Sequence, residues 1–318
     1  MVVQDAQNAG ANPADGLPAR GAGVATPTGF AGMTSAHGRA LLRSPMLVFG
    51  GLLLLVLILL AAIGPPLWPI DPLKQSLLAR NKPPGWIDAR SVHHYLGTDQ
   101  VGRDIAARLL LGTRTSLLVG AFSAAGAALL GVSAGAIAGY FGRKTDAVIM
   151  RLVDIQMSFP FILIAIIWAL FIGSGFWSII LIVSLLGWTT YARIIRSRIL
   201  AVRELTYIEA ARAIGASGPR ILLRHVLPQT TSTIIIIGAL QIGTAVIFES
   251  TLGFLGLGIQ PPTPTLGNML ADGRSYLQTA WWLVVFPGVI LMLIVLGVNT
   301  FGDGLREVLS PGAERRHH

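Results

Sequence analysis

The sequence predicts an all-α membrane protein with about six transmembrane helices. Composition is the first observation: of 318 residues, 53% are hydrophobic and only 12% are charged, about half the charged share of a soluble domain. The second observation is that long uncharged stretches recur along the chain, and a bilayer core takes about 20 helical residues. The chain has no cysteine, so disulfides and thiolate metal sites are excluded.

The formal charge of +9 is the third observation. Such an excess is also found in nucleic-acid-binding proteins, but here the basic residues lie between the apolar stretches. Lys and Arg at the ends of membrane spans are the ordinary pattern in membrane proteins. We therefore expect contact with membrane lipid and no nucleic-acid partner.

Residues 1–34 differ from the rest of the chain. Gly, Ala, Pro, Asn and Thr dominate there, and few large apolar groups are present to offset the entropy of ordering. We expect a disordered cytosolic tail over 1–34 and one transmembrane domain over 35–318. A signal peptide is not expected, because the first apolar run begins only near Met46 and is too long.

Six spans are expected in order along the chain. They cover 46–70, 115–142, 155–172, 176–192, 225 to about 257, and a helix within 275–302. The third and fourth come from one uncharged stretch that is too long for a single helix, and Gly173-Ser174-Gly175 divides it. Trp281-Trp282 marks the membrane interface at the start of the sixth.

The positions of Lys and Arg predict the orientation. If the N-terminus is cytosolic, the tail, the 2–3 loop, the 4–5 loop and the C-terminus all lie inside, and together they hold 16 of the 24 basic residues. Positive charge concentrates on the cytosolic side of membrane proteins. Both termini are therefore expected in the cytosol of a bacterial cell, with the protein in the inner membrane.

The connection between the fourth and fifth spans is longer than most connections between helices. Residues 203–214 are mostly good helix formers. The segment Gly215-Ala216-Ser217-Gly218-Pro219 then ends the helix, because glycine adopts the left-handed C-cap and proline cannot continue a helix. A second short helix is expected over 220–226, closing at Leu227-Pro228.

Glu209-Ala210-Ala211, Gly215 and Leu227-Pro228 together resemble the EAA loop of ABC importer permeases. In that family a short helix along the membrane face docks into a cleft on the ATPase subunit. The resemblance implies that Glu209, Ala210, Ala211, Gly215 and Pro228 couple this chain to an ATPase, within a coupling loop at about 203–228. The residue types suit this role, since alanines permit close approach, a carboxylate can pair with a basic group, and glycine allows a sharp reversal.

Further segments resemble the second, C-type permease of the dipeptide, oligopeptide and nickel transporter family. They are 94–104, 138–142 with 150–154, 252–262, and 302–306 followed by Pro311, so the resemblance covers about 40–311. It implies the type I ABC importer permease fold. It also implies three kinds of partner: a homologous second permease, two ABC ATPase subunits and an extracytoplasmic substrate-binding protein.

No catalytic residue is assigned. The chain has no G-x-x-x-x-G-K-[ST] motif and hence no P-loop of its own, so ATP and Mg²⁺ are expected only in partner subunits and no cofactor in this chain. Gly131-Val132-Ser133-Ala134-Gly135 matches a hydrolase elbow, but it lies within the second expected span, where small residues four apart indicate helix packing. The pair His93-His94 lacks a third ligand at a recognisable spacing, so no metal site is expected.

Glu249 is the candidate residue for the translocation pathway. An ionisable group within a span is costly in lipid and is a functional candidate by default. It either faces the pathway, where it would meet a substrate's ammonium group, or makes a structural contact to a neighbouring helix or to the second permease. Sequence reasoning leaves both alternatives open.

The predicted function is that of an importer permease, with peptides as the expected cargo. The alternative is a secondary transporter with its own coupling ion. That class tends to have internal repeats and several intramembrane charges, whereas the sequence shows no clear repeat and only Glu249 as a candidate. Whether the cargo is a dipeptide, an oligopeptide, a nickel chelate or glutathione is left open, because selectivity commonly resides in the external binding protein.

Overall fold

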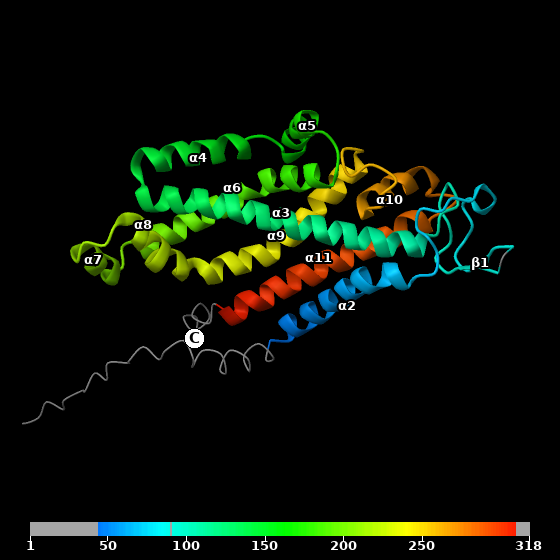
Figure 1. Cartoon of the computed structure of the whole chain (residues 1–318), viewed down its shortest axis with the longest axis horizontal. Coiled ribbons are helices and arrows are strands. Elements are labelled where there is room, and N and C mark those ends of the chain that lie inside the picture. The colour runs from blue at the N-terminus through cyan, green and yellow to red at the C-terminus, as the bar shows by residue number, and fades with distance from the viewer. Residues whose placement is uncertain (1–43, 90, 310–318) are drawn as a thin grey trace, which may run out of the picture.

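The computed structural model describes residues 44–89 and 91–309, and its long helices form an elongated bundle (Figure 1). In this part of the chain, five helical stretches are long and apolar enough to cross a membrane. They contain α2 (Pro45–Leu67), α3 (Ile105–Phe141), α6 (Phe176–Val202), α9 (Thr231–Phe254) and α11 (Trp282–Leu309). The predicted all-α membrane fold is confirmed. The expected tail over 1–34 lies outside the described residues.

The third expected span, 155–172, is wrong as a single straight helix. The structure instead has α4 (Arg143–Met157) and α5 (Phe161–Ile172), which meet at a bend of 100°. The 12 residues of α5 rise only about 18 Å, less than a bilayer core of about 30 Å. Pro160 is the physical cause, because proline lacks the N–H and clashes with the preceding turn of a helix. Counting the bent pair as one span gives up to six.

Two further helices extend beyond the spans expected from the sequence. The second span was expected from Thr115, but α3 begins at Ile105, where the side chain of Asp104 accepts a hydrogen bond of 2.7 Å from the Ala107 N–H. Likewise α6 continues ten residues beyond Ala192, to Val202. Arginine is a good helix former, so charge marks the edge of the apolar stretch without ending the helix.

The chain between α6 and α9 folds into a compact unit at one end of the bundle (Figure 1). It contains α7 (Thr206–Ala213), α8 (Gly218–Ile221), the π-helical turn η2 (Leu222–Val226) and the 3-10 turn η3 (Leu227–Thr230). The predicted order of helix, break and helix is confirmed. Leu227-Pro228 lies where the fifth span was expected to begin, and Pro228 is in the first turn of η3, where a missing N–H is tolerated. Helical structure therefore continues into α9.

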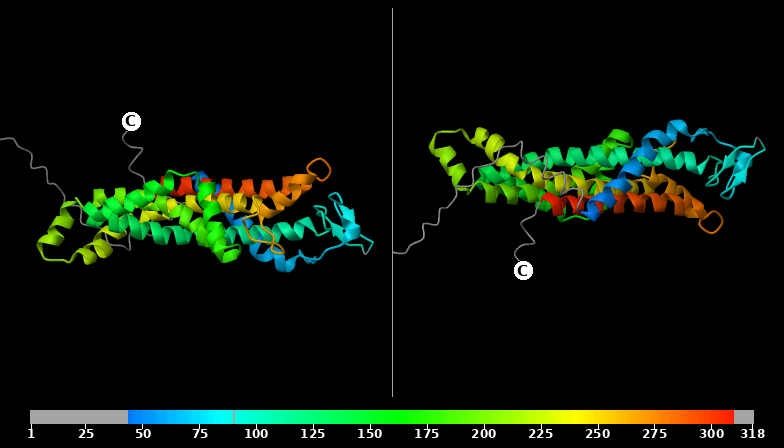
Figure 2. Two further views of the ribbon diagram at one scale, coloured as in Figure 1. Left: turned by 90° about the horizontal axis from the view of Figure 1, so that it is seen from above. Right: turned by 90° about the horizontal axis from the view of Figure 1, so that it is seen from below.

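Residues 68–89 and 91–104, which we call the hairpin segment, fold at the opposite end of the molecule (Figure 2). The segment holds the turn η1 (Leu77–Ala79) and two antiparallel strands, β1 (Trp86–Ile87) and β2 (His93–His94), with Trp86 opposite His94. It is fixed to α11 by the Trp282 Nε1–H, which donates a 3.2 Å hydrogen bond to the Thr98 carbonyl oxygen.

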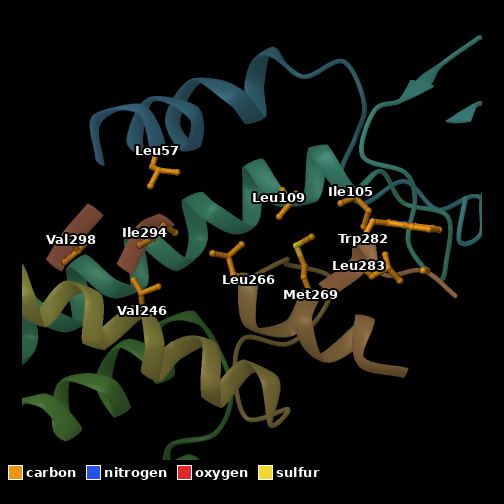
Figure 3. Close-up of a cluster of buried hydrophobic side chains, with 11 residues drawn as sticks. Leu57, Ile105, Leu109, Val246, Leu266, Met269, Trp282, Leu283, Ile294 and Val298 are labelled. Carbon is orange, nitrogen blue, oxygen red and sulfur yellow. The ribbon is translucent and has the colours of Figure 1, made fainter. Parts of the chain in front are cut away.

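A buried apolar cluster joins the helices near the hairpin segment (Figure 3). It includes Leu57 from α2, Leu109 from α3, Val246 from α9 and Ile294 from α11. The short helix α10 (Leu266–Gly273), which leads into η4 (Arg274–Tyr276), adds Leu266 and closes the bundle between α9 and α11. A capping box between Thr265 and Asn268 fixes its start.

Small residues bring α3 and α6 into close contact. A Cβ at Gly131 would collide with the Trp188 carbonyl oxygen, and one at Gly135 would lie 3.0 Å from the Ala192 Cα. Such spacing lets helix backbones approach in lipid. The packing interpretation of Gly131-Val132-Ser133-Ala134-Gly135 is confirmed, since these residues lie within α3.

Candidate functional site

The helix α7 rests on an apolar base made by its own subunit. Ile208 and Ala211, three positions apart, are buried together with Ile221 from α8 and Ile199 from α6. Residues three apart share one face of a helix. An eight-residue helix is too short to be stable alone in water, so this base holds α7 in place.

Two backbone hydrogen bonds end α7 at the predicted glycine. Gly215 has a φ of +83°, a conformation that favours glycine. Its N–H donates to the Arg212 carbonyl oxygen at 3.0 Å, and the Ala216 N–H donates to the Ala211 carbonyl oxygen at 3.1 Å. This pair of bonds is the Schellman motif, so Gly215 makes the reversal that the sequence predicted.

The opposite side of α7 carries a surface that we call the coupling surface. It consists of five exposed residues, Leu205, Glu209, Ala210, Ala213 and Ile214. Ile214 is 85% exposed, and Glu209 forms no ion pair with any described residue. An exposed apolar patch beside a carboxylate is typical of a protein-binding surface.

The predicted coupling residues therefore separate in the structure. Ala210 faces outward, whereas Ala211 is buried in the base. Gly215 and Pro228 are exposed and shape the backbone on either side of α8. Of the two alanines, only Ala210 offers the close approach expected for both.

Polar contacts connect this end of the molecule to α3 and α4, and no local sequence pattern indicated them. The Arg196 guanidinium on α6 forms a two-point ion pair with Asp146 on α4, with 2.6 Å between Nη2 and Oδ2. Arg203 Nη1 donates to the Gly139 carbonyl oxygen on α3 at 3.0 Å. The Tyr207 hydroxyl donates to the His225 carbonyl oxygen at 3.3 Å. The first two contacts therefore join the end of α6 to α4 and α3, and the third joins α7 to η2.

Glu249, the pathway candidate, is fully buried between α3, α9 and α10. Its Oε2 accepts hydrogen bonds from Ser116 Oγ at 2.9 Å and from Ser250 Oγ at 3.3 Å. The Ser116 hydroxyl oxygen in turn accepts the Leu266 N–H at 3.3 Å. The second carboxyl oxygen, Oε1, is buried without a hydrogen-bond partner among the described residues, so these contacts hold Glu249 against neighbouring helices and leave half of its carboxyl group unpaired.

A second buried polar group, which sequence reasoning missed, lies where the hairpin segment meets α3. Asp99 Oδ2 lies 2.6 Å from Arg103 Nε and 2.5 Å from Arg108 Nη1. Asp272 on α10 lies 3.3 Å from Arg108 Nη2. Asp99, Arg103 and Arg108 lie close together in the sequence, whereas Asp272 comes from a distant segment, so no local spacing revealed the whole group.

His94 lies beside Asp104, with 2.8 Å between Nδ1 and Oδ2. Across residues 44–89 and 91–309, no group of three or more His, Asp or Glu side chains is arranged to hold a metal ion. The position of His94 is explained by its contact with the carboxylate that caps α3.

Comparison with known families gives two matches. Residues 131–315, more than half of the chain, match the family described as the binding-protein-dependent transport system inner membrane component. Residues 37–84 match the N-terminal TM domain of oligopeptide transport permease C. The two matches together take in α2, the C-terminal part of α3 and every later helix.

Individual relatives are similar over most of their length. The dipeptide transport system permease protein DppC of Alkalihalophilus pseudofirmus is 40% identical, over 85% of this chain and 87% of the relative. The probable D,D-dipeptide transport system permease protein DdpC of Escherichia coli is 36% identical, over 85% and 89%. The glutathione transport system permease protein GsiD of Pectobacterium atrosepticum is 39% identical, over 86% and 89%.

A solved structure has the same fold. An inward-facing structure of the MetNI methionine ABC transporter matches with a TM-score of 0.52 and 21% identity, over 63% of this chain and 95% of that chain. At this identity the match shows the fold alone, and it agrees with the expected ABC importer permease architecture.

Proposed function

The chain belongs to the family of binding-protein-dependent transport system inner membrane components, and from this premise we propose that it forms half of the pore of an ATP-driven peptide importer. As a member of this permease family it is a multi-pass inner-membrane protein. The proposed complex adds a homologous second permease, two ABC ATPase subunits and an extracytoplasmic binding protein. In this proposal ATP and Mg²⁺ are used by the ATPase subunits, and this chain binds no cofactor.

The coupling surface is the observation that carries the proposal. Ile214 and Ala210 are exposed at the end of the molecule, while Ile208 and Ala211 fix α7 from behind. A short helix held in this way can transmit a displacement. We propose that the ATPase receives this surface in a cleft and that a basic group of the ATPase pairs with Glu209, because a charge-assisted hydrogen bond is stronger than a neutral one.

The connection from α7 to the membrane supports transmission of movement. The helix α6 is continuous over 27 residues, about 40 Å at the rise of an α-helix. Its C-terminal part, with Ile195 and Ile199, packs in one cluster with Ile208. Closure of the two ATPase subunits around ATP would push on the coupling surface of this chain and on the corresponding surface of the second permease at once. The bundles would then rock between outward and inward openings, as rigid-body movements at an interface allow.

The choice of peptide cargo rests on the relatives. Two of them carry names that specify dipeptides, and a third is named for glutathione, which is itself a short peptide. A backbone with amide groups is common to all three cargoes. A nickel chelate or another solute would contradict this part of the proposal without affecting the rest.

The decisive variant is Glu209→Lys, which reverses the charge on the coupling surface without touching the base of α7. Like charges facing each other across an interface cost several kcal/mol, so we expect recovery of the ATPase with the purified permease to fall at least about tenfold. Uptake of radiolabelled dialanine into cells should fall in parallel, while the amount of permease in the membrane stays unchanged.

The matched control is Glu204→Lys. Glu204 is also exposed, but it pairs with the adjacent Arg203 at 3.0 Å and lies outside the coupling surface. Normal ATPase recovery with Glu209→Lys, or equal losses with both variants, would contradict the docking role of Glu209. Dialanine uptake that survives depletion of ATP would instead favour the secondary transporter.

A further inference from the structure

A crevice of about 220 Å³ opens within the membrane-spanning part of the bundle. It lies between the bend that joins α4 to α5 and the facing sides of α6 and α9. Its polar lining consists of two amides and three hydroxyls, from Gln156, Thr189, Thr190, Gln241 and Thr244. No charged side chain lines it among the described residues.

The crevice lies beside the midpoints of two long helices. Thr189 is the midpoint of α6 (Phe176–Val202), one turn before Arg193 at the end of the expected span 176–192, and Gln241 with Thr244 brackets the midpoint of α9 (Thr231–Phe254). In the apolar part of a membrane an unpaired polar group costs several kcal/mol. Five polar side chains at such a position need a specific explanation.

Three of these side chains have no partner within the protein. Gln241, Thr189 and Thr190 make no side-chain hydrogen bond with any described residue, although Gln241 is only 7% exposed and Thr189 only 4%. None of their polar atoms is among the fully buried side-chain atoms without a partner, so these atoms are open to the crevice, whereas most polar groups inside proteins are hydrogen-bonded. Water or a passing solute in the crevice would supply the missing partners.

Gln156 shows the contrast within the same crevice. Its Nε2 donates to the Leu185 carbonyl oxygen at 2.8 Å, and its Oε1 accepts the Trp188 Nε1–H at 2.9 Å. Gln156 is therefore committed to holding the end of α4 on α6. The amide of Gln241, on the opposite wall, stays available.

Gly187 makes room for the Gln241 amide. A Cβ at position 187 would lie 2.6 Å from Gln241 Nε2, so any other residue would displace this side chain. Towards α10 the crevice ends at Phe161 and Phe248, whose rings stack with 4.6 Å between their centroids. The polar groups thus occupy a built site between a glycine and an aromatic pair.

We propose that this crevice is part of the chain's share of the translocation pathway, where Gln241, Thr189 and Thr190 hydrogen-bond the backbone amides of a passing peptide. The proposal rests on the proposed function above. Amides and hydroxyls match the donors and acceptors of a peptide backbone. Since the described lining is uncharged, it favours no particular charge on the cargo side chains.

Water accessibility tests the crevice without relying on transport. The chain has no cysteine, so a single Thr190→Cys variant in the assembled complex can be treated with a membrane-impermeant, cationic methanethiosulfonate. Val56→Cys is the control, because Val56 is exposed at the midpoint of the apolar helix α2. Thr190→Cys should react at least tenfold faster than Val56→Cys. Equal, slow reaction of the two would show a crevice filled by lipid or by the second permease, and would overturn the proposal.

Transport supplies the second test. Gln241→Leu and Thr190→Val each remove hydrogen-bonding groups at nearly constant volume, and each should lower kcat/KM for radiolabelled dialanine about five- to tenfold while ATPase recovery stays normal. The control is Thr251→Val on the same α9, since the Thr251 hydroxyl is exposed and bonds the Ile247 carbonyl oxygen of its own helix. Normal uptake in both crevice variants would overturn the pathway assignment. Absence of dialanine uptake in the unmodified complex would overturn the proposed function instead, and the labelling result would stand independently.

Discussion

Asp99 is buried between Arg103 and Arg108 where the hairpin segment meets α3. Removing one partner from a buried ion pair leaves an uncompensated charge and typically costs 3–5 kcal/mol. We expect Asp99→Asn to lower the free energy of unfolding by about that amount. The effect can be measured by heating the purified complex and recording the temperature at which the permease is lost from solution.

An exposed ion pair gives the matched comparison. Asp154 and Arg193 lie 3.0 Å apart with more than half of each side chain exposed, and such pairs contribute about 0–1 kcal/mol. Asp154→Asn should therefore leave the unfolding temperature nearly unchanged. If Asp99→Asn is equally mild, the buried cluster does not stabilise the hairpin segment.

Single residues were predictable where their signal is local. The reversal of the chain at Gly215 could be predicted from its neighbours, because helix-forming residues precede it and Pro219 follows it. The structure has a φ of +83° at Gly215. The direction in which Ala211 points could not be predicted, since it depends on Ile221 and Ile199 brought in from other helices. Gln241 and Thr189 were missed for the same reason.

Close packing of α2 on α11 can be tested at two adjacent glycines. A Cβ at Gly50 would collide with the backbone of Phe301, whereas one at Gly51 would lie 3.6 Å from the Phe301 ring, an ordinary contact. Gly50→Ala should destabilise the protein by about 1–3 kcal/mol through overpacking. Gly51→Ala should be neutral or stabilising by up to about 1 kcal/mol, because alanine is the better helix former.

The readout for this pair is again thermal unfolding in detergent, with both variants made in the same background. Gly50 and Gly51 both lie inside α2. They therefore differ mainly in how closely each packs against Phe301 on α11. Equal stability of Gly50→Ala and Gly51→Ala would mean that α2 can shift away from α11 at little cost.

Helices were predictable from apolar length, and their ends were not. The boundaries of α2 came within a few residues, because no charge interrupts it. The ends of α3 and α6 were misplaced, since Arg108 and Arg196 are satisfied by carboxylates and continue the helix. The bend between α4 and α5 was missed because Pro160 lies in a stretch without charge. The ends of the expected spans follow from charged residues, and none lies near this bend.

The hairpin segment and the coupling surface lie at opposite ends of the molecule (Figure 2), which makes the predicted orientation testable. In intact cells, an impermeant maleimide should label Tyr95→Cys in the hairpin segment, where Tyr95 is 63% exposed. Ile214→Cys should react only after the cells are permeabilised. The reverse pattern would show that the positive-inside assignment is inverted.

The architecture and the family of the protein were within reach of the sequence. Composition predicted the membrane, and the segment from Glu209 to Pro228 predicted the permease family that the relatives show. The cargo was beyond reach, because it depends on partners outside this chain. The crevice was beyond reach too, since α4, α6 and α9 assemble it from distant segments.

The exposed Ile214 also bears on how the cell handles this protein before assembly. In the predicted orientation, a subunit made in excess of the proposed ATPase would present that side chain, 85% exposed, to the cytosol, together with Leu205 and Ala210. Chaperones and membrane-bound proteases bind apolar surface of this kind. We therefore expect the surface proposed to transmit work in the complete importer to direct an unassembled subunit to removal, so that steady-state levels of the permease follow the supply of the proposed ATPase.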